Sequence, residues 1–241
     1  MAIPISEYSG KFVEGFDPRI KAYFDWLHKQ NLDLDNDLIQ KMSNQLSFDS
    51  NIPIGYGCGS SGALVAATFD MAKISDKPPT REFLGEMESF FHGKSSGLDP
   101  LVCYNNKPYV LHEEATQELV WDEELLPEYD LYDSDTARST NRLVNLYKQK
   151  MAKNNFSDAM DYLTEINNQI IDRLLANDYV DFELIDRLSV QQREWMDEFI
   201  PADVQEVWDK GFDSGDYAFK LCGAGGGGFF LQFFPDYEEE D

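Results

Sequence analysis

The stretch Pro53-Ile54-Gly55-Tyr56-Gly57-Cys58-Gly59-Ser60-Ser61-Gly62-Ala63 is the most informative part of the sequence. Its glycines and serines precede an apolar run, residues 64–69, that is typical of the first turns of a buried helix. Glycine lets successive backbone N–H groups point inward, and a helix N-terminus adds unpaired N–H donors and the positive end of the helix dipole. The stretch therefore predicts a phosphate-binding loop, with the Ser60 and Ser61 hydroxyls placed to contact phosphate or a metal ion.

Several other patterns compete for this stretch. A tight turn with a serine N-cap needs fewer glycines. Residues 57–62 fit the dinucleotide fingerprint G-x-G-x-x-G, but that motif follows a buried strand, and residues 47–53 are polar and interrupted by proline. Residues 59–63 nearly fit the nucleophile elbow G-x-S-x-G but end in alanine, and neither histidine downstream, His92 or His112, has a supporting context. A P-loop would end in Gly-Lys-Ser/Thr, and the loop has no lysine.

Length and charge limit the class of protein. The chain has 241 residues, enough for one large or two small domains, and its formal net charge is −25. Such a surface repels nucleic acids and anionic membranes, so neither is expected as a partner. The three cysteines lie far apart in the sequence and predict neither a zinc site nor a disulfide framework. Together with the lack of a signal-peptide pattern or a long apolar segment, this favours a cytoplasmic protein.

Periodicity predicts an α+β chain. Strands are expected within residues 1–16 and at 101–104, 109–111 and 229–234, and residues 113–130 are acidic and irregular. Helices are expected from Asp17-Pro18, over residues 32–46, from the glycine loop to about Ser75, and after the N-cap candidate Thr80. Four more helices are predicted over residues 143–153, 156–177, 182–199 and 201–208. A domain boundary is placed near Thr136, which gives domains of residues 1–136 and 137–241.

Three segments call for a joint explanation: the glycine–serine loop, the segment from Glu88 to Asp99, and the late run Gly223–Gly228. Phosphoryl transfer from MgATP needs amides for the phosphates, a carboxylate and a hydroxyl for Mg²⁺, and a base near the accepting hydroxyl. Taken singly, however, Asp99 beside a glycine turn is typical of an Asx-turn, and Glu88 is typical of a solvated helix face. A histidine that ends a helix, as His92 is expected to, more often caps its carbonyls.

In these segments the chain resembles the GHMP kinases, the superfamily of galactokinase, homoserine kinase, mevalonate kinase and phosphomevalonate kinase. Residues 53–63 resemble its second motif, with Gly62 where alanine is frequent, and residues 88–99 resemble the mevalonate kinase version of its middle segment. Residues 220–228 resemble the third motif, with Cys222 where threonine is common. Asp133-Ser134 and Arg138-Ser139-Thr140 resemble the Asp-Thr…Arg-Ser-Thr segment of mevalonate kinases. The four matches follow the family order.

The resemblance implies the two-domain GHMP fold, with an N-terminal domain like ribosomal protein S5 domain 2 and a ferredoxin-like C-terminal domain. It implies ATP and Mg²⁺ as cofactors and a small-molecule alcohol as partner, most simply mevalonate in isoprenoid precursor synthesis. The alternatives are another acceptor, phosphomevalonate or a sugar, and a non-catalytic nucleotide-binding role. A homodimer is compatible with the sequence.

The resemblance also implies a role for individual residues. Ser61 and Glu88 would hold Mg²⁺, and Asp99 would accept the proton of the substrate hydroxyl. The residues that would contact the nucleotide are Pro53, Gly55, Gly57, Cys58, Gly59, Ser60, Ser61, Gly62, Gly223, Ala224, Gly225 and Gly226. Those that would lie on the substrate side are His92, Gly93, Ser96, Arg138 and Thr140.

The family's first motif, which supplies a lysine, has no counterpart here. Residues 1–5 resemble the stretch that follows that motif, and Lys11 lies in a different context and is expected to be exposed. A late start codon, a fragment, or a true loss of the motif would each explain this. We expect the polypeptide as it stands to phosphorylate poorly.

Overall fold

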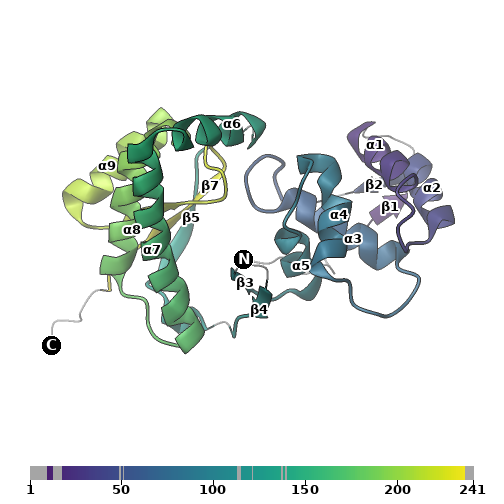
Figure 1. The fold of residues 1–241 in the computed structure, drawn as a ribbon, viewed down its shortest axis with the longest axis horizontal. Coiled ribbons are helices and arrows are strands. Elements are labelled where there is room, and N and C mark those ends of the chain that lie inside the picture. The colour runs from purple at the N-terminus through teal and green to yellow at the C-terminus, as the bar shows by residue number, and fades with distance from the viewer. Residues whose placement is uncertain are drawn as a thin grey trace. The chain divides into compact units, whose positions relative to one another are not determined.

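The computed structural model describes residues 10–12, 18–48, 50, 52–112, 115–120, 122–136, 138 and 140–236. Contacts divide the chain into two compact units (Figure 1). The first unit comprises Met1–Ile52 and Gly59–Glu118, and the second comprises Pro53–Cys58 and Leu119–Asp241. The sequence-based boundary at residue 136 differs from this division, because residues 119–136 belong with the second unit.

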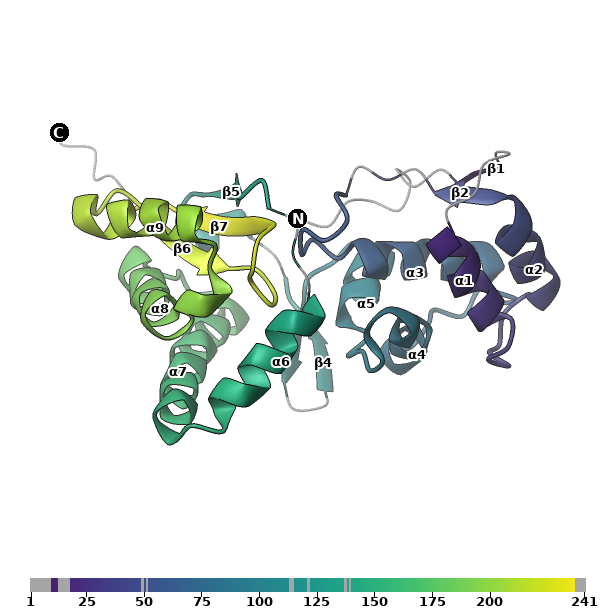
Figure 2. The same cartoon turned by 90° about the horizontal axis from the view of Figure 1, so that it is seen from above.

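The first unit is mainly helical. Its helices are α1 (Pro18–Leu27), α2 (Asn36–Gln45), α3 (Ser60–Ala72), α4 (Arg81–His92) and α5 (Leu98–Asn105). Two antiparallel strand pairs accompany them, β1 (Gly10–Phe12) with β2 (Leu46–Phe48) and β3 (Tyr109–His112) with β4 (Ala115–Glu118). Helix α3 packs against both α4 and α5, which lie beside it in Figure 2.

Helix α3 is buried on most of its surface, as its apolar sequence predicts. Val65, Ala66 and Ala72 are fully shielded from solvent, and Val65 and Ala72 join a core with Tyr23 and Met87. The predicted N-cap of α4 is confirmed, because the Thr80 hydroxyl accepts a hydrogen bond from the Phe83 amide at 3.2 Å. Local signals therefore place the helices around which this unit is built.

Two predicted segments differ in the structure. Residues 101–104, expected as a strand, lie in α5, which begins directly after Gly97 at a φ of 72°. A proline in the first turn, Pro100, is compatible with a helix because no intrahelical donor is needed there. Residues 113–130, expected to be irregular, include β4 and the start of β5 (Tyr129–Asp133).

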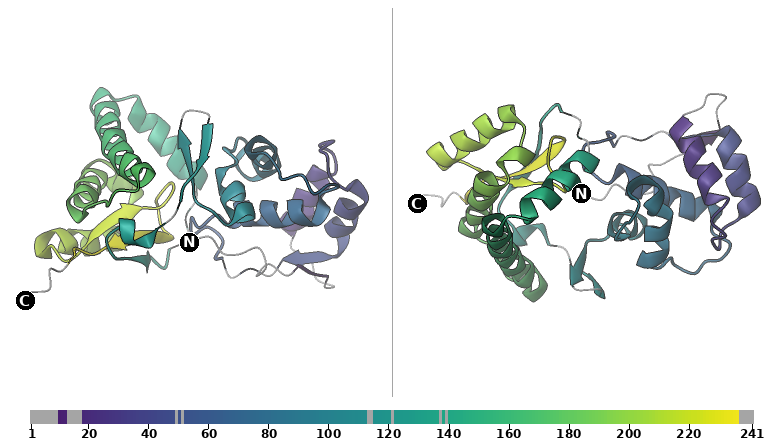
Figure 3. Two further views of the ribbon diagram at one scale, coloured as in Figure 1. Left: turned by 90° about the horizontal axis from the view of Figure 1, so that it is seen from below. Right: turned by 45° about the horizontal axis from the view of Figure 1, so that its top comes forward.

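The second unit contains a three-stranded antiparallel sheet in the order β5-β7-β6, where β6 is Ala218–Leu221 and β7 is Phe229–Phe233. Its helices are α6 (Thr140–Met151), α7 (Asn154–Ala176), α8 (Phe182–Trp195) and α9 (Ala202–Ser214), with short 3-10 turns η2 (Glu123–Leu125) and η3 (Asp197–Phe199). Figure 3 shows these helices grouped around the strands.

Alternate residues of β6 and β7 face two different cores, as the period of a strand requires. Ala218 and Phe233 join the core formed with α7 and α8, whereas Phe219 and Phe230 pack with Trp208 of α9. The mixture of helices and sheets confirms the predicted α+β class. Within the residues that the structure describes, no helix combines the length and the apolar character needed to cross a bilayer.

Candidate functional site

In the first unit the candidate site begins at the N-terminus of α3. The helix starts at Ser60, as predicted, and its N-cap residue Gly59 has a φ of 69° and no side chain to cap the first amides. The first intrahelical hydrogen bond runs from the Ala63 amide to the Gly59 carbonyl at 2.8 Å. The preceding amides of the first turn therefore point out of the helix, where an anion can accept from them.

The Glu88 carboxylate of α4 lies beside this helix start. Ser61 donates to Glu88 Oε1 at 2.9 Å, and the Ser95 hydroxyl donates to Glu88 Oε2. Glu88 is only 3% exposed, so the solvated position expected from its helix spacing alone is wrong. Burial raises the pKa of Glu88, the hydrogen bonds from Ser95 and Ser61 lower it, and the nearby charge of Asp99 raises it again.

His92 joins the same group. It is the last residue of α4, and its Nε2 lies 3.0 Å from Ser61 Oγ. The backbone of α4 is closed separately by the Gly93 amide, which donates to Ser89 O. The imidazole of His92 thus contacts the serine at the start of α3, in addition to any capping role.

Asp99 lies in the first turn of α5, directly against the start of α3. A Cβ added to Gly62 would lie 2.8 Å from Asp99 Cβ and 2.9 Å from Pro100 N. Asp99 is exposed to solvent, yet its charge acts on both Glu88 and Cys103, whose pKa values it helps to raise. The structure thereby brings Asp99, Ser61 and Glu88 to one end of α3, as the resemblance implied.

The loop between α4 and α5 places the other predicted residues differently. Ser96 accepts from the Leu98 amide at 3.3 Å through its hydroxyl and from Arg81 through its carbonyl. Gly93 has open space where a Cβ would lie. The serine of this loop that contacts Glu88 is Ser95. Sequence reasoning missed it because adjacent serines in a loop carry no signal that separates them.

In the second unit Arg138 joins two glycine segments. Its amide donates to Gly55 O at 3.1 Å, and its Nη1 donates to Cys222 O at 2.8 Å. Its guanidinium leaves no room for side chains on either segment: an added Cβ would come within 2.7 Å of it at Gly57 and 3.0 Å at Gly223. The predicted convergence of the loop of residues 53–58 with the late glycine run is present within this unit.

The rest of the late glycine run is tied to the protein interior. The Gly226 amide donates to Phe199 O at 2.6 Å, and a Cβ at Gly226 would meet Leu143 at 2.5 Å. The Gly228 amide donates to Thr136 O at 2.7 Å. Ala224 packs against the α7–α8 core. These contacts fix the shape of the run and occupy some of its donors.

Some predicted residues make few contacts or fall outside the description. Pro53 and Cys58 are exposed, and partial burial raises the pKa of the Cys58 thiol. The side chain of Thr140, and that of Lys11, which was expected to be exposed, lie outside the described side chains. Roles for these residues stay predictions.

The donor set in the first unit fits Mg²⁺. Hydroxyl and carboxylate oxygens are the ligands that this ion prefers, and it is usually held by one or two carboxylates, with phosphates and water completing the shell. Ser61 and Glu88 supply such a pair. In the described part of the chain, no group of three or more His, Cys, Asp or Glu side chains forms a metal site built from protein alone.

Comparison with known proteins identifies a domain family and a fold. Residues 23–107 match the family model of the GHMP kinases N terminal domain. No curated protein matches the chain in sequence. Solved structures do match in fold. Mevalonate kinase from methicillin-resistant Staphylococcus aureus MRSA252 is 17% identical, with 95% of this chain and 78% of that chain covered and a TM-score of 0.56.

Two further structures give the same result. The Lin0012 protein from Listeria innocua is 15% identical over 95% of this chain and 75% of that chain, with a TM-score of 0.61. L. major mevalonate kinase, solved in complex with R-mevalonate, is 15% identical over 93% of this chain and 71% of that chain, with a TM-score of 0.57. Residues 23–107 therefore match the GHMP kinase N-terminal domain, and the fold of the chain is similar to that of mevalonate kinases.

Proposed function

We propose that this protein is an ATP-dependent kinase that phosphorylates a small-molecule alcohol, with mevalonate as acceptor and 5-phosphomevalonate as product. The observation that carries the proposal is the gathering of Ser61, Glu88 and Asp99 at the uncapped N-terminus of α3. The match of residues 23–107 to the GHMP kinase N-terminal domain supports a kinase, and the likeness of the fold to two mevalonate kinases favours mevalonate. Isoprenoid precursor synthesis is then the process served.

In this proposal the start of α3 binds phosphate and metal. The outward amides of its first turn and the helix dipole attract the phosphates of ATP. Ser61 and Glu88 hold Mg²⁺, which offsets negative charge on the transferred group. The hydrogen bond between Ser61 and Glu88 keeps the two oxygens together before the ion binds. The sequence motif assigns the loop of residues 53–58 to nucleotide binding, and within the second unit Arg138 holds the backbone of this loop.

Asp99 acts as the base. As the acceptor oxygen forms its bond to the γ-phosphorus, the bond from that phosphorus to the bridging oxygen breaks and ADP leaves with the electron pair. The Asp99 carboxylate takes the proton of the acceptor hydroxyl. His92, next to Ser61, is assigned to the acceptor side because its ring is exposed.

The test of the base is ADP release by the full chain in the presence of ATP, Mg²⁺ and mevalonate. We expect Asp99→Asn to lower kcat by about 10²- to 10⁴-fold, the usual contribution of general-base catalysis. Asp76→Asn removes the same charge from an exposed loop and is the matched control. Turnover that survives Asp99→Asn would remove this residue from the mechanism.

The test of the metal site uses two glutamates of one helix. Glu88→Gln should raise the Mg²⁺ concentration for half-maximal rate about tenfold or more, since a neutral amide is a weaker ligand for a hard cation. Glu86→Gln, on the exposed side of α4, should leave the Mg²⁺ requirement unchanged. Equal effects of the two substitutions would contradict the assignment of Glu88.

A panel of acceptors separates the kinase from its substrate. Turnover of phosphomevalonate or a sugar, but not of mevalonate, would support the proposed kinase activity and show that the acceptor is a different one. ATP binding without turnover of any acceptor would instead indicate a non-catalytic nucleotide-binding protein. A homodimer and a cytoplasmic location stay predictions that accompany this proposal.

A further inference from the structure

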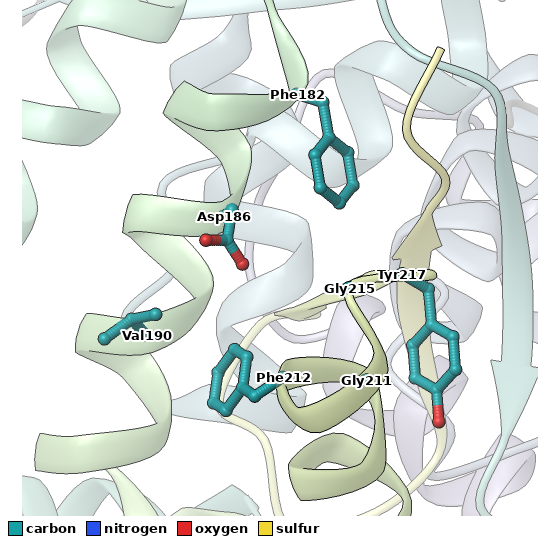
Figure 4. A pocket seen from close by; sticks show the side chains of 7 residues that line it. All are labelled: Phe182, Asp186, Val190, Gly211, Phe212, Gly215 and Tyr217. Carbon is teal, nitrogen blue, oxygen red and sulfur yellow. The ribbon is translucent and has the colours of Figure 1, made fainter. Parts of the chain in front are cut away.

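A small hollow of about 240 Å³ lies in the second unit between α8 and the end of α9 (Figure 4). Phe182, Asp186 and Val190 line it from α8, and Phe212 lines it from α9. Tyr217 follows α9 and completes the wall. None of these residues belongs to the kinase site proposed above, so the hollow needs a separate explanation.

Glycines make the room for this hollow. A Cβ at Gly215 would meet no atom within 4 Å, which leaves its rim open. At Gly211 a Cβ would lie 2.6 Å from the Tyr217 ring, so the ring packs directly on the α9 backbone. The Tyr217 hydroxyl is held by Val207 O at 2.8 Å, which fixes the ring as part of the wall. One wall of the hollow is therefore an anchored aromatic ring.

One charged group faces the hollow, the carboxylate of Asp186. Figure 4 shows it projecting from α8 toward the space between the two helices. The residues that line the hollow include no lysine, arginine or histidine, and no hydrogen bond or ion pair reaches this carboxylate from the described residues. Burial raises the pKa of Asp186, as expected for a carboxylate that loses water without gaining a cation.

We propose that this hollow binds a small organic ammonium ion, with the charged nitrogen on Asp186 and the apolar part between Phe182 and Phe212. A cation restores the interaction that the carboxylate lacks, and aromatic faces attract cations in addition to apolar groups. The volume suits a ligand smaller than a typical drug. The net charge of −25 adds a general attraction for cations.

The test uses phenethylammonium and its neutral counterpart 2-phenylethanol with the full chain. Dissociation constants are measured by titration of the ¹H–¹⁵N NMR spectrum, which also shows where each probe binds. We expect phenethylammonium to bind at least tenfold more tightly than 2-phenylethanol, with shifts centred on the residues that line the hollow. Phe212→Leu should lower the affinity for phenethylammonium several-fold, because the Asp186 carboxylate remains while an aromatic face is lost.

Asp186→Asn should lower the affinity for phenethylammonium at least tenfold and leave that for 2-phenylethanol nearly unchanged. Glu194→Gln removes the same charge from an exposed position of the same helix and should change neither value. Equal affinities for the two probes, binding that survives Asp186→Asn, or no binding at millimolar probe would each overturn the proposal. Kinase turnover is not part of the readout, so failure here leaves the proposed function untouched.

Discussion

At the scale of single residues, Glu88 is held in a costly environment. It is buried, it accepts from two serine hydroxyls, and the charge of Asp99 opposes its ionisation. A carboxylate kept for stability alone is usually paired with a cation. Here the charge of Asp99 opposes the ionisation of Glu88 more strongly than the charge of His92 favours it. This arrangement is typical of a group held ready for a ligand of opposite charge.

Glu88 gives a pH-dependent prediction without any ligand. A carboxyl whose pKa is raised by folding contributes stability below its unfolded pKa and loses it as pH rises through the folded value. Glu88→Gln removes the ionisation, so the variant should melt above the wild type at neutral pH and approach it in acid. The measurement is the Tm of each protein as a function of pH. For the control Glu86→Gln, the difference in Tm from the wild type should not change with pH. A variant that melts lower at neutral pH would contradict the argument.

Gly62 is constrained by packing. A Cβ on Gly62 would lie 2.9 Å from backbone atoms at the start of α5. Backbone atoms move aside less easily than the end of a side chain, so the helices would have to shift. Gly62→Ala should lower the free energy of unfolding by about 1–3 kcal/mol, the cost of overpacking. Ser60→Ala, at the first residue of the same helix, should change it by less than about 0.5 kcal/mol.

Urea unfolding followed by circular dichroism measures both variants. If Gly62→Ala unfolds at the wild-type midpoint, α3 and α5 can move apart at no cost. Alanine at this place, as is frequent in the family's second motif, would then fit here as well.

At the scale of elements, α8 completes the outer edge of the sheet. Among the strands that the structure describes, β6 pairs with β7 alone, so alternate amides of β6 point away from its partner. Ser189 accepts from the Phe219 amide at 3.1 Å and from Trp208 Nε1 at 2.8 Å, and Gln192 accepts from the Leu221 amide at 2.8 Å. Side chains of a helix thus replace the missing strand and keep the edge from pairing with another chain.

Gln192 and its neighbour offer a matched test of this edge. Gln192→Ala should lower the free energy of unfolding by about 1–3 kcal/mol, because it leaves the buried Leu221 amide without an acceptor. Gln191 is partly exposed, and its side chain has no hydrogen bond to any described residue. Gln191→Ala should therefore cost less than about 0.5 kcal/mol. Equal costs, measured by urea unfolding, would show that the edge bond contributes little.

The helices were predictable from the sequence because each carries an apolar face, a cap or a glycine boundary of its own. Thr80 and the Gly59-Ser60 start are such local signals. Strand β5 was not predictable, since its residues are mostly exposed and its pairing with β7 spans nearly the whole second unit. Residues 101–104 read as a strand because a short apolar run does not distinguish strand from helix.

The candidate site was predictable only in part, for a related reason. The motif order singled out Ser61, Glu88 and Asp99, and these three lie together. Nothing in the spacing of α4 indicated that Glu88 is buried or that Ser95 contacts it, because both facts depend on how the loop of residues 93–97 folds back. Likewise, the contact of Arg138 with Gly57 and Gly223 depends on pairings that no local pattern records.

At the scale of the whole molecule, neither unit is one continuous piece of chain. Residues 53–58 belong with the second unit although the first unit continues after them. The Tyr56 carbonyl accepts from Phe229, and the Gly55 carbonyl accepts from Arg138, which explains that membership. A domain boundary predicted from composition is a single point in the sequence. It therefore could not describe two units between which the chain passes more than once.

The two units share one electrostatic property, a large excess of negative charge. The chain has 45 Asp and Glu against 20 Lys and Arg, so more than half of its carboxylates cannot have a cation of their own. The ion pairs between described residues mostly involve exposed side chains, which contribute little each. Mutual repulsion of the remaining carboxylates therefore opposes the compact state.

Salt should relieve this repulsion and stabilise the protein. Between about 0.05 and 0.5 M NaCl the screening length falls well below the spacing of distant charges, so we expect Tm to rise. Each 1 kcal/mol of added stability corresponds to roughly 2–4 °C for a chain of this size. KCl should give the same rise if screening is the cause, whereas a difference between the two salts would indicate binding of one cation. A Tm that falls in both salts would mean that attractive pairs outweigh the repulsion, contrary to what the excess of carboxylates requires.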